Sequence, residues 1–142
     1  MKNKDNIIIL TGGSRGIGHA TSKKFWDDGW TVITFSRSEV APQCPWSNNK
    51  QLHFQVDLEN QISLDKTLLD LHKVLEGRPV KALINNAAID PKVQNDGMKF
   101  EGSRLENFSE EQWDLELDVG LKGAFICSKV FGRIMARRGD GG

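Results

Sequence analysis

Apolar residues occur along this chain in two alternating patterns. Short continuous runs of apolar and β-branched residues are typical of strands that a parallel sheet buries on both faces. These runs lie at 6–11, 31–36, 52–56 and 80–84. After three of them, apolar residues recur at steps of three and four, which is the spacing of one helix face. The helices predicted in this way span 16–28, about 61–76 and 109 to about 137.

Turn-forming residues separate these elements. Gly29 follows the first predicted helix, where a residue with positive φ commonly ends a helix. The segment 37–50 contains two prolines and several Ser and Asn residues, so we expect a long loop there rather than a helix. A second, polar loop is expected at 90–108. Ser109 and Gln112 have the spacing of a capping box at the start of the third helix.

The elements follow the order β-α-β-loop-β-α-β-α, without an internal repeat. This alternation predicts an α/β fold, a doubly wound parallel sheet with strand order 3-2-1-4, in a single domain over residues 1–142. In such a sheet, ligands bind beyond the carboxyl ends of the strands, where the strand order reverses. We therefore expect a binding crevice above the ends of the first and fourth strands.

The first strand runs directly into the glycine-rich turn Thr11-Gly12-Gly13-Ser14-Arg15-Gly16-Ile17-Gly18. The first glycine of this spacing permits a tight bend, the second lets a ligand approach the backbone, and the third lets the helix pack close to the sheet. The following helix offers unpaired N–H groups and the positive end of its dipole. A dinucleotide is therefore expected, with its pyrophosphate against Gly12, Gly16 and Gly18. Ile17 is expected on its nicotinamide side.

Asn85-Asn86-Ala87-Ala88 follows the fourth predicted strand. Together with Thr-Gly-x-x-x-Gly-x-Gly at 11–18, this segment resembles the short-chain dehydrogenase/reductase family, in which the corresponding segment reads Asn-Asn-Ala-Gly. The resemblance covers nearly all of this chain and only the N-terminal part of the family's fold. It implies that Asn85, Asn86, Ala87 and Ala88 steady the central sheet and line the ribose and nicotinamide of the cofactor. From the residues alone, Asn85 is expected to satisfy backbone groups at a buried strand end, which is compatible with this role.

The end of the second predicted strand indicates which dinucleotide is bound. Folds that select NAD carry a carboxylate there to hold the ribose 2′-hydroxyl, whereas this chain has Ser36 and Arg37. Ser14 and Arg15 can also reach a 2′-phosphate, which a guanidinium matches in charge and geometry. NADP(H) is therefore the predicted cofactor. NAD(H) is the alternative, in which Glu39 is the competing acid and Arg37 is only a surface charge.

Asp57 and Leu58 follow the third predicted strand. The resemblance implies that the Asp57 carboxylate accepts a hydrogen bond from the adenine amino group, with the backbone of Leu58 alongside. The alternative is that Asp57 caps the following helix. His53, within a strand, and His72, on a helix, have no partner at metal-ligand spacing. Both are interpreted as bystanders, and no metal site is predicted.

Hydride transfer to a carbonyl needs a proton donor. The resemblance implies a Tyr-x-x-x-Lys segment with a Ser and an Asn, yet the chain contains no tyrosine. Gly120 stands at the position of the Asn, and Asp118, two residues earlier, points to another face of the helix. We therefore expect a fragment with no catalytic residues, inactive alone. It would carry the cofactor-binding part of an NAD(P)-dependent oxidoreductase acting on alcohols or carbonyl compounds.

Two other functions stay open from the sequence: a non-catalytic dinucleotide-binding or sensing module, and an assembly subunit. A chain that stops after its fourth strand would leave one sheet edge and the apolar residues of the helix at 109–137 uncovered. We therefore expect marginal stability and a homo-oligomer formed through that helix.

Composition and charge exclude some partners. The 19 acidic and 19 basic residues balance, and the basic residues are scattered, which argues against nucleic acid or an anionic membrane as a partner. No apolar run approaches a membrane span and no signal-peptide core follows Met1, so a cytoplasmic protein is expected. Cys44 and Cys127 lack metal-ligand spacing and are expected to be free thiols.

Overall fold

The computed structural model describes residues 5–49, 52–75, 77–89 and 104–138. Along the chain the elements are β1 (Ile7–Thr11), α1 (Gly16–Asp27), β2 (Thr31–Ser36), β3 (His53–Gln55), α2 (Gln61–Leu75), β4 (Val80–Ile84), η2 (Leu105–Asn107), α3 (Glu110–Leu117), η3 (Asp118–Lys122) and α4 (Gly123–Arg138). The strands and the first two helices confirm the sequence prediction, with ends that differ by at most one residue. The short 3₁₀ helix η2 lies in the segment expected to be a polar loop, most of which falls outside the described residues.

The four strands form one sheet in the order β3-β2-β1-β4. Every pairing is parallel, with Ile9 opposite Ile33 on one side and Leu83 on the other. This confirms the predicted doubly wound arrangement. Because the strands are parallel, their carboxyl ends all meet at one edge of the sheet.

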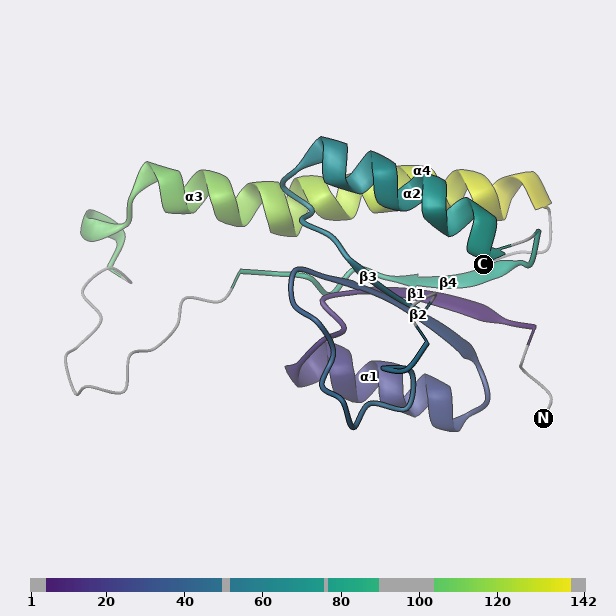
Figure 1. Ribbon diagram of the computed structural model, residues 1–142. Coiled ribbons are helices and arrows are strands. Elements are labelled where there is room, and N and C mark those ends of the chain that lie inside the picture. Colours follow the sequence, from purple (N-terminus) through teal and green to yellow (C-terminus); the bar gives the residue numbers. More distant parts are fainter. Residues whose placement is uncertain (1–4, 50–51, 76, 90–103, 139–142) are drawn as a thin grey trace.

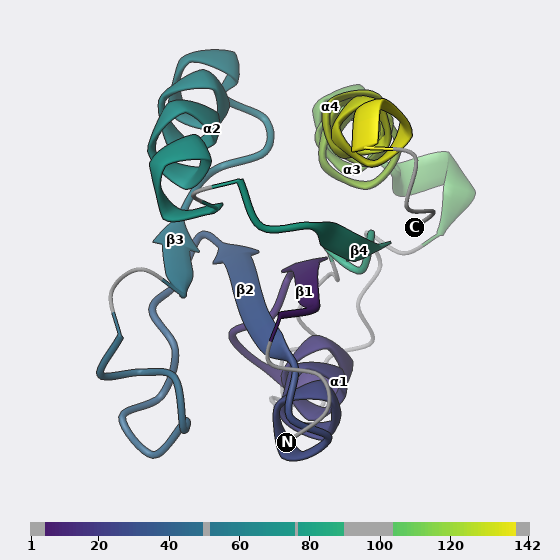
Figure 2. The same cartoon turned by 90° about the vertical axis from the view of Figure 1, so that its right-hand side faces the viewer.

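Helices cover both faces of the sheet (Figure 1). On one face α1 packs against β1 and β2, and on the other α4 packs against β4. Figure 2 shows α2 beside α4 on this second face, and the segment 37–49 on the same side of the sheet as α1. The central strand β1 is consequently enclosed, and Ile7, Ile8, Ile9 and Leu10 have no exposed surface.

The predicted long loop after β2 is confirmed, since residues 37–49 form no helix. It still contributes to the core through Trp46, which is fully buried. The Trp46 ring lies 5.9 Å from that of Trp26 and 5.5 Å from that of His19, both on α1. An aromatic side chain on the loop thus fills space beside α1 that a crossover helix would otherwise occupy.

The helix expected from 109 to about 137 is present but not uniform. It contains a π-helical turn, η3, between α3 and α4, which the sequence did not predict. Its start is confirmed, because the Ser109 hydroxyl accepts a hydrogen bond from the Gln112 backbone N–H at 3.1 Å. The Gln112 side chain also donates through Nε2 to Glu116 at 2.9 Å.

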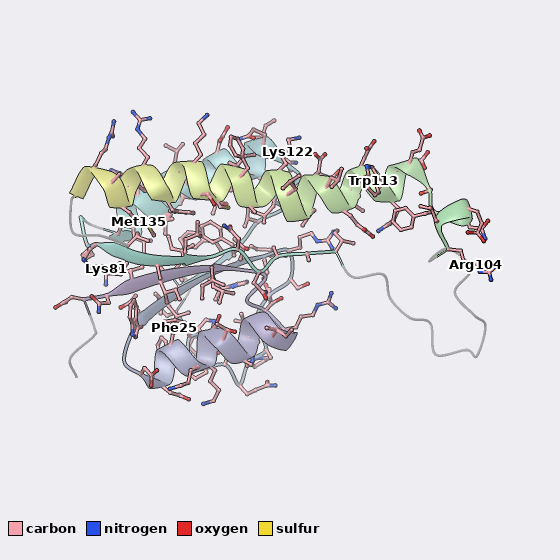
Figure 3. All side chains as sticks on the ribbon, turned by 180° about the vertical axis from the view of Figure 1, so that it is seen from behind. Phe25, Lys81, Arg104, Trp113, Lys122 and Met135 are labelled. Atoms are coloured by element: carbon pink, nitrogen blue, oxygen red, sulfur yellow. The ribbon has the colours of Figure 1, made fainter. Side chains whose placement is uncertain are left out.

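The N-terminal part of this helix extends beyond the strands. Figure 3 shows Trp113 on the portion that projects past the sheet, whereas Met135 points toward it. No residue of α3 is buried. None of the helices in the described part of the chain has the length and apolar character that a membrane span requires. The cytoplasmic location stays a prediction.

Candidate functional site

A pocket of about 850 Å³ lies at the carboxyl ends of the strands. Its lining includes every predicted cofactor-binding residue except Asn85, namely Gly12, Ser14, Arg15, Gly16, Ile17, Gly18, Ser36, Arg37, Asp57, Leu58, Asn86, Ala87 and Ala88. Phe35, Ser38, Val56 and Val119 complete it. The volume falls in the range of small-molecule and cofactor sites. Segments widely separated in the sequence therefore meet in one concave site.

The glycine turn has the geometry that a close backbone approach requires. Gly12 has φ +73°, and a Cβ there would lie 2.9 Å from both the Ala87 Cα and the Asn86 Nδ2 atoms. Gly16 has φ +55°, with nothing within 4 Å of its Cβ position. Gly12 therefore lets the turn pack against the segment after β4, and Gly16 leaves open space on the pocket side.

Two further glycines bring α1 close to the sheet. A Cβ on Gly18 would collide with the Gly12 carbonyl oxygen, which agrees with the predicted close packing of the helix. A Cβ on Gly13 would lie 2.5 Å from the Thr34 Cγ2 atom, in β2. The spacing used to recognise the turn did not single out Gly13.

The start of α1 is open toward the pocket. Arg15 occupies the N-cap position without a capping hydrogen bond from its side chain, and the first turn carries no acidic residue. The first N–H groups of α1 and the positive end of its helix dipole are thus available to an anion. Ile17 is 80% exposed. An apolar side chain so exposed at a pocket rim is well placed to cover a flat ring.

Thr11 ties the glycine turn to the segment after β4. Its hydroxyl accepts hydrogen bonds from the backbone N–H groups of Asn86, at 3.1 Å, and Ala87, at 3.0 Å. The Asn86 side chain donates in return to the carbonyls of Thr11 and Gly12, at 3.2 and 3.3 Å. Thr11 was missed as a site residue, although its place between a buried strand and the first glycine was a usable signal.

The expectation that Asn85 satisfies backbone groups at a buried strand end was wrong. Asn85 is exposed, and its side chain donates to the Ser128 hydroxyl on α4 at 3.0 Å. It is Asn86, its neighbour, that satisfies backbone carbonyls at the end of β1. Successive residues in extended backbone point to opposite sides, so one Asn faces the glycine turn and the other the helix layer.

The end of β2 forms another wall of the pocket. Ser36, Arg37 and Ser38 line the pocket, and Glu39 does not. The Ser36 hydroxyl donates to the Ser38 carbonyl at 2.7 Å. Its hydrogen is therefore already used, and the Arg37 guanidinium is the strong donor that this strand end offers.

Asp57 is not the cap of α2. The Asn60 side chain accepts from the Ser63 N–H at 3.1 Å and fills that role. Asp57 accepts from the Glu59 N–H at 3.2 Å and lines the pocket. Leu58 is buried, and its Cβ lies 3.2 Å from the Cβ position of Gly123 on α4.

Gly120 lies inside the π-helical turn η3, and nothing stands within 4 Å of its Cβ position. Asp118 forms an exposed ion pair with Lys122 at 3.2 Å, so its carboxylate is engaged elsewhere. From this turn it is Val119, an apolar residue, that lines the pocket.

His19, His53 and Cys44 have hydrogen-bonding partners. The interpretation of His53 as a bystander was incomplete, because both of its ring nitrogens are hydrogen-bonded. Both cysteines are free, as predicted. Cys44 lies 2.7 Å from the His19 Nε2 atom, and burial raises the pKa of the Cys127 thiol to about 11. No group of three or more metal-ligating side chains occurs in the described ranges.

Known proteins are similar in sequence to this chain. The FixR protein of Bradyrhizobium diazoefficiens is 41% identical over 92 residues, 64% of this chain and 33% of that protein. The NAD-dependent glycerol dehydrogenase of Listeria innocua is 27% identical over 96% of this chain and 50% of its own length. The chain thus spans about half, or less, of the length of these relatives.

Solved structures show the same arrangement. A short-chain dehydrogenase/reductase family oxidoreductase from Brucella ovis, in complex with partially ordered NAD, superimposes with a TM-score of 0.75. It is 31% identical, and the match covers 92% of this chain and 57% of that one. The family model for short chain dehydrogenases matches residues 6–142. The chain therefore belongs to the short-chain dehydrogenase family.

Proposed function

We propose that this chain forms the cofactor-binding part of an NADP(H)-dependent oxidoreductase that transfers hydride between the dinucleotide and an alcohol or carbonyl compound. The nicotinamide, when bound, donates or accepts the hydride. The residues of this chain bind and orient the dinucleotide. The observation that carries the proposal is the wall at the end of β2, where Ser36, Arg37 and Ser38 line the pocket and the acid Glu39 does not.

The proposed cofactor residues divide the pocket into three regions. The glycine turn at 12–18, with the open start of α1, takes the pyrophosphate. Asp57 and Leu58 take the adenine. Ile17 and the segment 85–88 take the nicotinamide and its ribose. This assignment is supported by the pocket, whose lining includes residues from all three regions and, of the assigned residues, lacks Asn85.

The preference for NADP(H) rests on hydrogen-bond donors. A 2′-phosphate accepts hydrogen bonds and carries negative charge, so it needs donors of positive charge. Arg37 and Arg15 both line the pocket and supply guanidinium groups. The Brucella oxidoreductase was solved with NAD, and the proposal for this chain depends instead on its own residues at the end of β2.

A fluorescence titration of the 142-residue chain with NADPH and NADH tests the preference. The unmodified chain should bind NADPH more tightly. Arg37→Ala should weaken NADPH binding about 10- to 100-fold, the value of a charge-assisted hydrogen bond, and leave NADH binding unchanged. Arg133→Ala is the matched control, because Arg133 is exposed on α4 and outside the pocket lining. Equal affinity of the unmodified chain for both dinucleotides would contradict the proposal.

The proton transfer is assigned to residues outside the described site. The chain has no tyrosine, and Gly120 offers no side chain at the position of the family's catalytic Asn. We infer that the 142 residues alone bind the cofactor but do not turn over. Incubation with NADPH and a panel of aldehydes and ketones should give no NADPH oxidation, and measurable turnover would overturn this.

Gly120 also favours a second candidate, a non-catalytic dinucleotide-binding or sensing module. The two candidates differ in what the full-length gene product does. An enzyme oxidises NADPH with some carbonyl compound, whereas a sensing module binds NADPH without turnover.

We propose that the exposed apolar side chains of α3 and the following turns pack against a second copy of the chain. Trp113, Leu121 and Phe125 are 56, 66 and 64% exposed, and an apolar stripe of this kind is typical of an interface. Light scattering should show a dimer or larger assembly that Phe125→Glu disrupts. Leu69→Glu, at a residue 70% exposed on α2, is the control and should leave the assembly intact. A monomeric unmodified chain would refute the proposal.

A further inference from the structure

Two side chains of β3 hold the backbone that follows β2. The Gln55 side-chain amide donates to the Arg37 carbonyl at 2.8 Å. The His53 Nε2 atom lies 3.0 Å from the Ser38 carbonyl oxygen. His53 and Gln55 are two residues apart in a strand, so their side chains lie on the same face of the sheet. Together they contact two consecutive carbonyl groups of one short segment.

The hydrogen bonds determine the state of the His53 ring. The Ser38 carbonyl can only accept, so Nε2 carries the hydrogen and donates it. In the neutral ring Nδ1 is then an acceptor, and it lies 2.8 Å from the hydroxyl of Thr34, a fully buried residue of β2. The imidazole is thus held at both nitrogens between the sheet and the Ser38 carbonyl. That carbonyl also accepts from the Ser36 hydroxyl.

The segment held in this way is the one that faces the adenosine end of the pocket. Ser36, Arg37 and Ser38 line the pocket, whereas His53 and Gln55 do not. Arg37 is exposed, so the position of its backbone sets the point from which its side chain extends toward a ligand. A backbone that is ordered before binding lowers the entropic cost of placing that guanidinium on a ligand.

We propose that His53 and Gln55 are positioning residues that fix the Arg37-Ser38 backbone and so set the selectivity for the substituent at the ribose 2′-position. The inference rests on the proposed cofactor function. His53 and Gln55 do not line the pocket, so they act on the ligand through the Arg37-Ser38 segment. Removing the His53 contact therefore lowers affinity for a 2′-phosphorylated nucleotide and spares the unphosphorylated one.

Calorimetric titrations of the 142-residue chain with 2′,5′-ADP and with 5′-ADP test this. His53→Leu removes the donor to Ser38, whereas His53→Gln retains an amide donor at the same distance along the side chain. His53→Leu should bind 2′,5′-ADP about fivefold more weakly, the value of one net hydrogen bond, with 5′-ADP unchanged. His53→Gln should restore most of the loss. Thermal melts of each variant establish that it is folded.

NMR relaxation of the unliganded chain supplies a readout that does not depend on the cofactor. The backbone order parameters of residues 37 and 38 should be lower in His53→Leu than in the unmodified chain, and His53→Gln should not show this decrease. Unchanged order parameters there, or equal losses of affinity for both nucleotides, would overturn the inference. An unmodified chain that binds both nucleotides equally would instead count against the proposed NADP(H) preference.

Discussion

Replacing Thr11 by valine should cost the protein a large part of its stability. Valine has nearly the same shape but no hydroxyl, and in the structure that hydroxyl accepts from the N–H groups of Asn86 and Ala87. Thr11 is 1% exposed, so water does not readily take its place. An unsatisfied buried donor costs about 1–3 kcal/mol. Because Asn86 and Ala87 are only partly buried, we expect about 1–2 kcal/mol for each N–H group and a loss of about 2–4 kcal/mol for both. A domain is stable by only about 5–15 kcal/mol in total.

Urea unfolding, followed by tryptophan fluorescence, measures this loss. With a typical dependence of about 1–3 kcal/mol per molar urea, the midpoint should fall by about 1–2 M. Thr11→Ser is the matched variant, because it keeps the hydroxyl and removes only a methyl group, at a cost of about 1 kcal/mol. NADPH affinity should fall in Thr11→Val and be largely retained in Thr11→Ser, since residues 86–88 line the pocket.

The comparison between the two variants decides the point. If the hydrogen bonds of the hydroxyl matter, Thr11→Val should be less stable than Thr11→Ser. If only hydrophobic packing matters, Thr11→Ser should be the less stable variant. A Thr11→Val protein as stable as, or more stable than, Thr11→Ser would refute the role assigned to the hydroxyl.

Three further changes test other parts of the structure. Gly18→Ala places a Cβ 2.5 Å from the Asn86 Nδ2 atom. It should destabilise the fold by about 1–3 kcal/mol and abolish NADPH binding. Gly132→Ala, in open space on α4, is the control and should stabilise the fold. Equal melting temperatures of the two variants would contradict this prediction. Burial lowers the pKa of His53, so the unfolded chain takes up its proton first. The free energy of unfolding should therefore fall as the pH drops below about 6.5 and through the lowered pKa of His53. The urea midpoint of His53→Gln should fall less over that pH range. Identical changes of the midpoint with pH in the variant and the unmodified chain would count against this prediction. Because the pKa of Cys127 is about 11, only about one thousandth of the thiol is ionised at pH 8. Alkylation located by mass spectrometry should reach it only upon unfolding, and rapid labelling of the folded chain would exclude the buried placement.

Much of the fold could be predicted because buried segments are recognisable in the sequence as runs or periodic patterns of apolar residues. The run Ile7–Leu10 is apolar throughout and leads into a glycine turn, which indicates a strand enclosed on both faces. The tight bend at Gly12, where φ is +73°, followed from the glycine spacing. Strand order followed from the connectivity of the elements, which few topologies satisfy.

The parts that could not be predicted depend on contacts between distant segments. Nothing local distinguishes Asn85 from Asn86, because their roles are set by which side of the backbone faces Thr11. His53 gained its role from a loop 15 residues earlier in the chain. Sequence periodicity was also insensitive to the π turn, since one extra residue per turn blurs a three-and-four spacing without abolishing it.

The π turn η3 places about one residue more in a helical turn than an α-helix does. In a regular helix each residue advances the direction of the side chains by about 100°. If all residues of this segment were in regular α-helix, the side of α3 that carries Trp113 would therefore face about 100° away from its present direction, relative to α4, which packs against β4. The π turn thus absorbs one residue between the pocket and the projecting end of the helix. Deleting one residue within Asp118–Lys122 should restore regular α-helix and leave both Trp113 and the pocket where they are.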